Sequence, residues 1–381
     1  MPESKIGIGQ AGFGGIGKVH AHAYRSIAAY YPGVLPEVRM AGVCTQSEAS
    51  AARAVREGGF ARGYSRIDRL LADPEVTVVD CSLPNHLHKE VILSALAARK
   101  HVYCEKPLCL AAAEAREIQS AAKTSSLKIG MTFNYRFVPA IVRAKQLIEE
   151  GAIGDLYNFH FVYLHTGYQD QSRPLSWRMQ RGLSGGGALA DLGSHIIDLA
   201  RYLLGELSTV FATQKTFITE RPRSSGAPDK GPVDVDDAMW LQARLASGAI
   251  GTMEVSRFAT GSLDDLRFRI EGTKGALKFD LMDANWLYWY DGRRRGGDLG
   301  GERGWVRLET ASHFSGAAIP TPRSILGWER SHAENQFRFL KSITEGTEPS
   351  PGLADGVAVQ LVMDAAYRSA ESGRWVDVPS E

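Results

Sequence analysis

The stretch Lys5-Ile6-Gly7-Ile8-Gly9-Gln10-Ala11-Gly12-Phe13-Gly14-Gly15-Ile16-Gly17 decides the fold of the first half of this chain. Residues 5–9 have the pattern of a short buried strand, and a helical pattern begins at Lys18. Between them, Gly12, Gly14 and Gly17 have the GxGxxG spacing that binds a dinucleotide when it joins a strand to a helix. These glycines allow the tight turn, the approach of backbone to a pyrophosphate and close helix–strand packing. The stretch therefore predicts an N-terminal dinucleotide-binding domain.

Strand-like and helix-like segments alternate after this fingerprint. The expected strands are 38–44, 76–82, 101–105 and 127–132, and the expected helices are 48–58, 66–72, 86–98 and 110–123. Such alternation predicts parallel βαβ units in a doubly wound sheet, with the ligand crevice outside the carboxyl ends of the strands. We expect this Rossmann domain to span residues 1–132.

The second half has a different pattern. After a helix at 138–150 and a strand at 155–164, strand-like runs follow one another without helices between them, at 207–219, 237–246, 250–258, 266–271, 276–280 and 286–290. Consecutive strands predict a largely antiparallel, open-faced sheet with helices on one face. We expect residues 133–381 to form this α+β domain for substrate binding and oligomerisation, with the final helices, 328–344 and 354–372, packing back toward the first domain. The expected fold class is thus α/β plus α+β.

The residues after the expected strand 38–44 bear on the choice between NAD and NADP. An acid there would hydrogen-bond the ribose 2′-hydroxyl of NAD. This chain has Thr45-Gln46-Ser47 instead. A 2′-phosphate would meet no carboxylate and could accept from two hydroxyls, although no arginine is adjacent. We expect NAD or NADP as cofactor, with NADP favoured.

Two loops at expected strand ends carry polar groups toward the predicted crevice. The first is Ser82-Leu83-Pro84-Asn85, followed by His86 and His88, and the second is Glu105-Lys106-Pro107. Proline fixes its own φ and restricts the residue before it, which gives Lys106 a defined place. An ordinary exposed loop lysine is the alternative. The HxH pairs His20/His22 and His86/His88 have no carboxylate or thiolate at metal spacing, so we expect no metal.

A further set of chemical groups falls between Gly185 and Asp198, where three glycines lead into an apolar helical pattern. Asp191, His195 and Asp198 are spaced i, i+4 and i+7, so a continuous helix would stack them on one face. A carboxylate one turn from an imidazole can fix its tautomer and raise its basicity, as a general base requires. An amphipathic surface helix is the alternative, and Asp198 could equally be structural.

Together these motifs resemble the Gfo/Idh/MocA family of nicotinamide-dependent oxidoreductases, in the family's order and over nearly the whole chain. The segments that carry the resemblance are the fingerprint with His20, Pro84-Asn85-His86-Leu87-His88, Glu105-Lys106-Pro107, Phe133-Asn134-Tyr135-Arg136-Phe137 and residues 185–198. Ser176-Trp177-Arg178 looks like the branch of the family that acts on cyclitols and sugars.

The resemblance implies that Lys106, Asp191 and His195 are the catalytic residues. Cofactor contacts are expected from Gly12, Phe13, Gly14, Gly15, Ile16, Thr45, Gln46, Ser47, Ser82, Leu83, Pro84, Asn85, His88, Glu105, Lys106, Asn134, Trp177 and Arg178. Substrate contacts are expected from Lys106, Arg136, His165, Asp191, His195 and Arg257.

The expected reaction is oxidation of a secondary alcohol of a sugar, anhydrosugar or cyclitol to the ketone by hydride transfer. His195 would act as base, Asp191 would orient it, and Lys106 would polarise the developing alkoxide. One alternative is an enzyme that keeps its cofactor bound and performs isomerisation or glycoside cleavage through a transient ketone. The other is a non-catalytic, nucleotide-sensing regulator on the same fold.

Bulk properties limit the partners. The formal net charge of +1 provides no field to attract nucleic acid or a membrane surface. No window approaches ~18 uninterrupted apolar residues, and the N-terminus lacks signal-peptide architecture. The four cysteines form no CxxC pair, and we expect a cytoplasmic protein. We also expect a homodimer or homotetramer formed through the open face of the second sheet.

Overall fold

The computed structural model describes residues 5–310, 314–321 and 324–379. The chain forms two compact units: unit 1 comprises residues 1–137 and 312–357, and unit 2 comprises residues 138–311 and 358–381. The Asn134–Phe137 turn therefore belongs to unit 1, beyond the expected boundary at 132. The first of the final helices, Trp328–Glu345, also belongs to unit 1. None of the helices within the described ranges is both long and apolar enough to cross a membrane.

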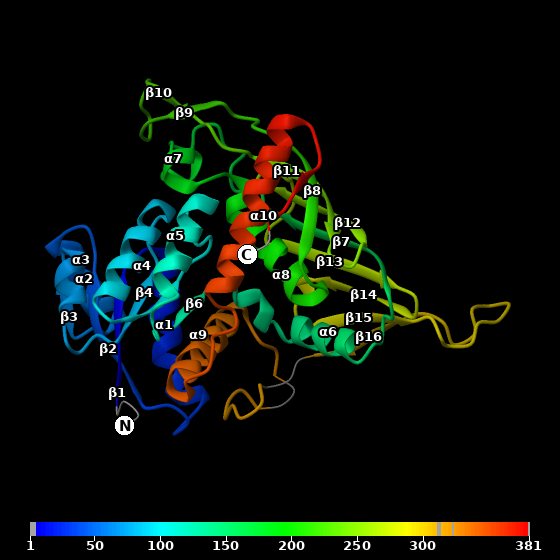
Figure 1. Ribbon diagram of the computed structural model, residues 1–381, viewed down its shortest axis with the longest axis horizontal. Helices are drawn as coiled ribbons and strands as arrows, with labels where there is room; N and C mark the ends of the chain where they lie inside the picture. Colours follow the sequence, from blue (N-terminus) through cyan, green and yellow to red (C-terminus); the bar gives the residue numbers. More distant parts are fainter. Residues whose placement is uncertain (1–4, 311–313, 322–323, 380–381) are drawn as a thin grey trace. The chain divides into compact units, whose positions relative to one another are not determined.

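The described residues of unit 1 form a six-stranded parallel sheet in the order β3-β2-β1-β4-β5-β6, with helices between successive strands (Figure 1). The strands are β1 (Lys5–Ala11), β2 (Glu37–Cys44), β3 (Arg62–Tyr64), β4 (Val78–Cys81), β5 (His101–Cys104) and β6 (Ile129–Met131). The helices are α1 (Gly15–Tyr30), α2 (Glu48–Gly58), α3 (Ile67–Leu71), η1 (Asn85–Leu87), α4 (His88–Ala97), α5 (Ala112–Ala122), η2 (Asn134–Phe137) and α9 (Trp328–Glu345). This doubly wound topology confirms the Rossmann prediction for the N-terminal domain.

One strand of unit 1 was missing from the sequence prediction. β3 is a three-residue strand at the edge of the sheet, and none of its residues is buried. Such a short segment shows no apolar run, so its pairing with β2 decides its conformation.

Helix α9 belongs to unit 1 because it packs on α1. The rings of Tyr31 and Phe337 stack with centroids 3.5 Å apart. The Tyr31 hydroxyl donates to the buried Glu334 carboxylate, which also pairs with Arg330 at 3.0 Å. A buried charge is tolerated when it is paired and hydrogen-bonded in this way. The expected packing of the final helices toward the first domain stays a prediction.

Unit 2 is organised on a nine-stranded sheet, counted over its described residues, in the order β16-β15-β14-β13-β7-β12-β11-β8-β17. Its strands are β7 (Leu156–Leu164), β8 (Leu207–Lys215), β11 (Ala238–Leu245), β12 (Ile250–Ser256), β13 (Asp265–Gly272), β14 (Gly275–Asp280), β15 (Trp286–Asp291), β16 (Trp305–Glu309) and β17 (Val376–Asp377); β9 (Glu220–Pro222) and β10 (Lys230–Pro232) form a separate hairpin. The helices are α6 (Pro139–Glu149), η3 (Trp177–Met179), α7 (Arg181–Ser184), η4 (Leu189–Gly193), α8 (Ser194–Leu204), η5 (Leu281–Asp283) and α10 (Leu353–Ser372), which begins in unit 1.

The sheet is largely antiparallel, as predicted, with one parallel pair, β7–β12, near its centre. β7 precedes the other strands in the chain and lies between β12 and β13, and the run of consecutive segments gave no sign of this insertion. α8 packs against β7, and α6 packs against α8 and β15 (Figure 1). The predicted fold class, a Rossmann domain plus an open-faced sheet with helices, is confirmed.

Candidate active site

The glycine fingerprint has the geometry of a phosphate-binding turn. Gly12 has a φ of +94°, and a Cβ on Gly17 would lie 2.7 Å from the Gly12 carbonyl oxygen. The Gln10 side-chain amide holds the turn by donating to the carbonyls of Gly12 and Gly17 at 2.9 and 2.7 Å. A Cβ at Gly14 or Gly15 would meet no atom within 4 Å, so the side of the turn at the start of α1 is open. A dinucleotide pyrophosphate fits this cradle.

The other predicted fingerprint contacts flank this turn. Phe13 packs edge-on against Phe60, with ring centroids 5.9 Å apart, and Ile16 is half-buried. The Ser82 hydroxyl donates to the carbonyls of Ala11 and Gly12 at 3.3 and 3.2 Å. The end of β4 and the fingerprint are thus joined by side-chain hydrogen bonds.

The segment after β2 is built around a helix cap. The Ser47 hydroxyl accepts from the Ser50 amide at 3.2 Å, and the Ser50 hydroxyl accepts from the Ser47 amide at 3.1 Å. The Thr45 hydroxyl lies 2.7 Å from the Ser50 hydroxyl, while Gln46 is exposed. The two hydroxyls that the sequence offered to a 2′-phosphate are therefore already hydrogen-bonded to the start of α2.

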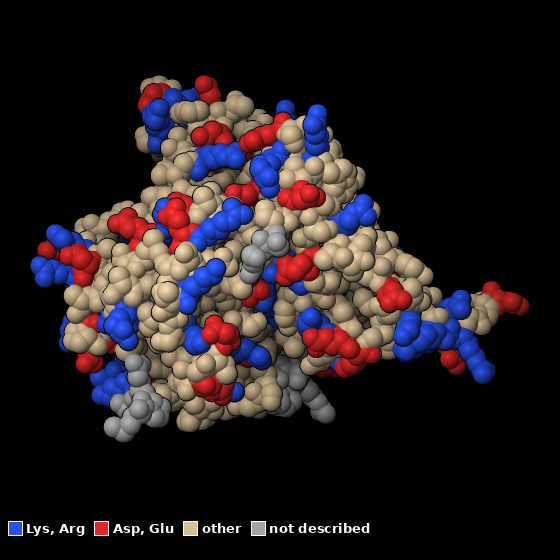
Figure 2. All heavy atoms as spheres, in the orientation of Figure 1, with Lys and Arg blue, Asp and Glu red and all other residues tan. Residues whose placement is uncertain are grey.

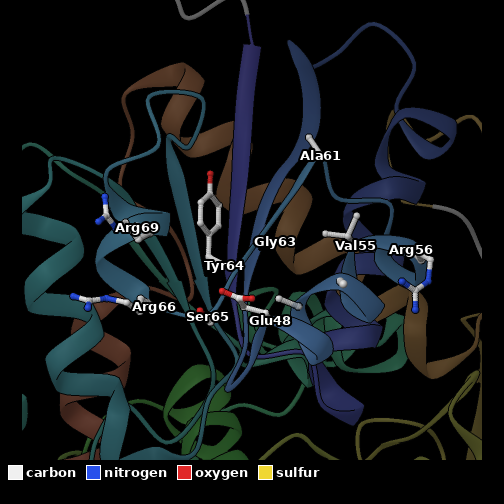
Figure 3. A pocket seen from close by; sticks show the side chains of 11 residues that line it. Glu48, Val55, Arg56, Ala61, Gly63, Tyr64, Ser65, Arg66 and Arg69 are labelled. Atoms are coloured by element: carbon white, nitrogen blue, oxygen red, sulfur yellow. The ribbon is translucent and has the colours of Figure 1, made fainter.

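A shallow hollow of about 640 Å³ lies beside this segment, between α2, β3 and α3 (Figure 3). Its lining residues are Glu48, Ala51, Ala52, Val55, Arg56, Ala61, Gly63, Tyr64, Ser65, Arg66 and Arg69. None of residues 45–47 is among them. The Arg66 guanidinium is bonded to Asp68 at 3.0 Å, so its charge is balanced locally.

The loop after β4 is joined to the loop after β5 by His88. The His88 Nε2 lies 2.9 Å from the Leu83 carbonyl oxygen, and Nδ1 lies 3.0 Å from the Pro107 carbonyl oxygen. Asn85 is buried, whereas Leu83 and Pro84 are half-buried. Both predicted loops therefore lie at the carboxyl edge of the parallel sheet, where the crevice was expected.

His88 also belongs to a buried trio with Cys81 and Cys104, whose potential ligand atoms lie within 4.8 Å of one another. Both imidazole nitrogens already face carbonyl oxygens. Burial, together with the neighbouring Cys81, raises the pKa of the Cys104 thiol well above its usual value. The chemistry of this trio fits a packed interior better than a metal centre.

Glu105 and Lys106 follow β5 above a buried ionic cluster. The His20 Nδ1 lies 2.9 Å from Asp80 Oδ2, and Nε2 lies 3.0 Å from Glu105 Oε1. Burial alone would lower the pKa of His20, but the two carboxylates overcome that effect and raise it to about 10. Burial raises and His20 lowers the pKa of Glu105, with a net lowering. A protonated His20 between two carboxylates therefore lies beneath the loop that carries Lys106.

Asn134 and Arg136 lie on η2 and are buried. The Asn134 amide donates to the Ser331 hydroxyl at 3.0 Å, and Arg136 Nη2 donates to Asp355 Oδ1 at 2.7 Å. Each of these predicted contacts thus has a polar partner within unit 1. Their proposed contact with cofactor or substrate remains a prediction.

In unit 2, Asp191 lies in a π-helical turn, η4, and His195 lies in the first turn of α8. The sequence predicted a continuous α-helix here, and that detail was wrong. The Ser194 amide bonds to the Leu189 carbonyl, and the Ser194 hydroxyl donates to the Ala190 carbonyl at 2.8 Å. π-turns of this kind occur often at functional sites. The Asp191 side chain is 30% exposed, whereas His195 and Asp198 are buried.

Two of the three glycines before this turn, Gly186 and Gly187, are required by close packing within unit 2. A Cβ on Gly186 would lie 1.9 Å from the Tyr367 hydroxyl oxygen, and one on Gly187 would lie 1.7 Å from the Asp236 carbonyl oxygen. The Asp236 carboxylate accepts from the amides of Gly187 and Leu189, at 2.7 and 2.8 Å, and from the Tyr367 hydroxyl at 2.8 Å. Asp236 therefore caps the start of the turn that carries Asp191, and the sequence reading did not identify it.

Arg257 lies behind Asp191 and is 2% exposed. Its Nη2 donates to the Gly187 carbonyl at 2.7 Å and to Asp191 Oδ2 at 3.4 Å, and its Nη1 donates to the Arg178 carbonyl at 3.2 Å. Burial lowers and Asp191 raises the pKa of this guanidinium, which ends above its ordinary value. Arg257 thus joins the Asp191 turn to η3, where the Arg178 guanidinium stacks 4.3 Å from the Trp177 ring.

His165 belongs to a partly exposed polar group at the end of β7. Its Nε2 lies 3.1 Å from Asp264 Oδ1, which also accepts from the Tyr163 hydroxyl at 2.7 Å. The Tyr163 ring in turn lies 6.0 Å from the His195 ring. Tyr163 and Asp264 were not predicted, because alternation along β7 shows only the face of the sheet on which Tyr163 lies, and Asp264 lies in the loop before β13.

Comparison with known proteins defines the class. Residues 6–133 match the family model described as the oxidoreductase family, NAD-binding Rossmann fold, and residues 141–278 match the GFO/IDH/MocA C-terminal domain. The chain belongs to the Gfo/Idh/MocA family, as the sequence resemblance indicated. It is therefore an oxidoreductase, and its first unit is an NAD-binding domain.

Similar proteins cover nearly the whole chain. Levoglucosan dehydrogenase from Pseudarthrobacter phenanthrenivorans is 37% identical over 98% of both chains, and myo-inositol 2-dehydrogenase from Thermotoga maritima is 27% identical over 97% of both. A solved structure of levoglucosan dehydrogenase in complex with NADH matches with a TM-score of 0.94 and 36% identity, over 99% of this chain and 100% of that one. Another, in complex with NADH and levoglucosan, matches with a TM-score of 0.93, at the same identity and coverage.

Proposed function

We propose that this protein oxidises a secondary alcohol of a sugar, anhydrosugar or cyclitol to the ketone, with a nicotinamide dinucleotide as oxidant. The observation that carries the proposal is the full-length likeness to levoglucosan dehydrogenase, whose solved structures contain NADH and levoglucosan. The bound dinucleotide would accept the hydride from the ring carbon at nicotinamide C4. His195 would take the hydroxyl proton as the carbonyl bond forms.

The surroundings of each residue support these roles. Asp191 lies one turn before His195 and is held by the buried guanidinium of Arg257, so it can orient the imidazole. We assign Arg257 to this support, since it is almost wholly buried. Lys106 would polarise the developing alkoxide, as an ammonium group can when water is excluded. The half-exposed His165 and Asp264 offer donors and acceptors that suit sugar hydroxyls.

The test is a spectrophotometric screen at the NADH absorption band with levoglucosan, inositols and hexoses. The purified protein is first checked for bound dinucleotide, because turnover without added cofactor would favour isomerisation or glycoside cleavage instead. Lys106→Ala and His195→Ala should each lower kcat by ~10²-fold or more. The exposed His22 supplies a matched His22→Gln control. Near-wild-type turnover of both alanine variants would refute the assigned roles.

The preference for NADP is part of this proposal. Its support is the absence of a carboxylate in residues 45–47. The hydrogen-bonded hydroxyls of Thr45 and Ser47 argue for a modest preference, since they would have to exchange partners. Fluorescence titration with NADH and NADPH measures the ratio of the two Kd values. Thr45→Asp should raise the Kd for NADPH about tenfold, equivalent to ~1.4 kcal/mol of like-charge repulsion, and lower the Kd for NADH, because the new carboxylate can accept from the ribose 2′-hydroxyl. Much tighter NADH binding by the wild type would contradict this preference.

We further propose self-association through the open face of the unit 2 sheet. Alternation along β14, β15 and β16 places Lys278, Tyr288, Trp286, Trp305 and Arg307 on the face opposite the buried Leu277 and Leu287. Lys278 lies 4.6 Å from the Trp305 ring, and Arg307 lies 4.0 Å from the Trp286 ring. A Trp305→Ser variant should shift the mass measured by light scattering toward the monomer. An unchanged mass would exclude this face of the sheet from the interface.

The cytoplasmic location also remains a proposal. All four cysteines are buried free thiols, which suits a reducing compartment.

On the face drawn in Figure 2, basic and acidic side chains are interspersed, in keeping with a small-molecule enzyme rather than a nucleic-acid-binding protein.

A further inference from the structure

We propose that two buried histidines, His20 and His88, are positioning residues that hold the Glu105-Lys106-Pro107 loop from its two sides. The inference rests on the proposed function, since it gives these residues a role in placing Lys106 for the reaction. Both histidines are completely buried within unit 1, and neither is assigned a catalytic step above.

On the first side, His20 connects β4 to the residue before Lys106. Its Nδ1 faces both carboxylate oxygens of Asp80, at 2.9 and 3.1 Å. Its Nε2 lies 3.0 Å from Glu105 Oε1, a contact of ion-pair rather than hydrogen-bond geometry. The other Glu105 oxygen, Oε2, accepts from the Lys106 backbone amide at 3.1 Å. A continuous polar chain thus runs from Asp80 through His20 to the backbone of Lys106.

On the second side, His88 holds the residue after Lys106. One ring nitrogen faces the Pro107 carbonyl oxygen at 3.0 Å and the other faces the Leu83 carbonyl oxygen at 2.9 Å. A neutral imidazole donates one proton, so it bonds to one of these oxygens at a time. His88 thereby spaces the Lys106 loop from the loop after β4. The backbone before and after Lys106 is consequently held by two different histidines, one on α1 and one on α4.

The physical benefit is precision. A group that polarises an alkoxide must be held close to its productive position, and a displacement of about 1 Å can cost ~10²-fold in rate. Loops are ordinarily the mobile parts of a fold. Here His20 lies on α1, the helix that begins at the glycine fingerprint. The position of Lys106 is therefore fixed relative to the same helix that would bind the pyrophosphate.

The experiment uses Glu105→Gln and His88→Gln in the full-length protein, because His20→Gln would leave two buried carboxylates facing each other and could prevent folding. His22→Gln, on the exposed side of α1, is the control. With levoglucosan, or the sugar that the screen selects, each variant should lower kcat about tenfold or more, while the KM for sugar stays within about threefold of wild type. In a Lys106→Ala background the same substitutions should cause no further loss, because they act through Lys106.

A second readout does not depend on activity. Acetic anhydride labelling of Lys106, followed by mass spectrometry and normalised to the exposed Lys18, should rise in Glu105→Gln and His88→Gln and remain unchanged in His22→Gln. Unchanged kcat and unchanged labelling would overturn the inference. So would losses that persist in full in the Lys106→Ala background. If the wild type oxidises no sugar while labelling rises as stated, the positioning stands and the proposed function alone fails.

Discussion

In unit 1 the loop that carries Lys106 is anchored by buried charges, whereas in unit 2 the turn that carries Asp191 is anchored mainly by steric fit. The first anchor is a protonated His20 between Asp80 and Glu105. The second is a glycine backbone packed against Asp236 and Tyr367 with no space for a Cβ. An electrostatic anchor depends on pH and a steric one does not. The difference teaches that one protein can fix two segments by mechanisms that fail under different conditions.

The largest effect should come from breaking the steric anchor. In Gly187→Ala the new Cβ would lie 1.7 Å from the Asp236 carbonyl oxygen, so backbone must move. We expect a loss of about 3 kcal/mol or more in the free energy of unfolding, measured by urea denaturation. Gly182→Ala is the control, since a Cβ there meets nothing within 4 Å and alanine favours a helix. Equal denaturation midpoints for the two variants would show that the packing is not restrictive.

Removal of the cap should have the next largest effect. Asp236→Ala deletes the acceptor for the amides of Gly187 and Leu189 and for the Tyr367 hydroxyl. A lost cap and buried donors without an acceptor should cost about 2 kcal/mol and lower kcat through displacement of Asp191. Asp234→Ala, which removes a single exposed contact to the Arg181 amide, is the matched control. A similar thermal midpoint for the two alanine variants would contradict the capping role.

The electrostatic anchor should make unit 1 sensitive to alkali. The pKa of His20 is raised to about 10 in the folded chain, against an unfolded value of ~6.5. The folded state therefore binds the extra proton between these values, and the stability it provides is full below ~6.5 and is lost as pH rises toward ~10. The thermal midpoint should fall over that window, and less steeply in Glu105→Gln. Asp236→Ala should lower the midpoint without changing the slope. A flat wild-type profile would disprove a charged His20.

The smallest effect concerns His332, which lies 5.7 Å from the His20 ring and has no hydrogen-bond partner for either ring nitrogen among the described residues. Burial, reinforced by the charge on His20, lowers its pKa to about 3. The unfolded chain takes up a proton first as pH falls below ~6.5, so the neutral histidine costs stability in acid. His332→Phe should be about 1 kcal/mol more stable than wild type near ~pH 5.5 and nearly equal to it near ~pH 8. Equal stability at both pH values would argue against a neutral, buried ring.

Much of the fold could be predicted because its signals are local. The fingerprint, the alternation of strands and helices and the run of consecutive strands all act over a few residues, and each matched an observed element. Edge strand β3 and the π-turn at Asp191 could not be predicted in this way. β3 is set by pairing with β2, and the turn by contacts to Asp236 and Arg257.

The candidate site divides in the same manner. Motifs in the sequence pointed to Lys106, Asp191 and His195 as candidates. In the structure, Lys106 follows the end of β5, Asp191 lies in the π-helical turn η4, and His195 lies in the first turn of α8. The residues that support them are distant in sequence: Asp236 lies 49 residues from Gly187, and His20 lies 60 residues from Asp80. No local periodicity encodes such partners, because they meet only after the chain has folded.

The sequence by itself therefore determined the family and the two kinds of sheet and supplied the candidate site residues, since hydrophobic periodicity and short motifs express local physical chemistry. Only the tertiary structure decided that Gly186 and Gly187 pack against Tyr367 and Asp236, and that His20 bridges two carboxylates beside the Lys106 loop. The physical reason is that steric exclusion and buried charge pairing depend on the three-dimensional neighbours of a residue, which lie far from it along the chain.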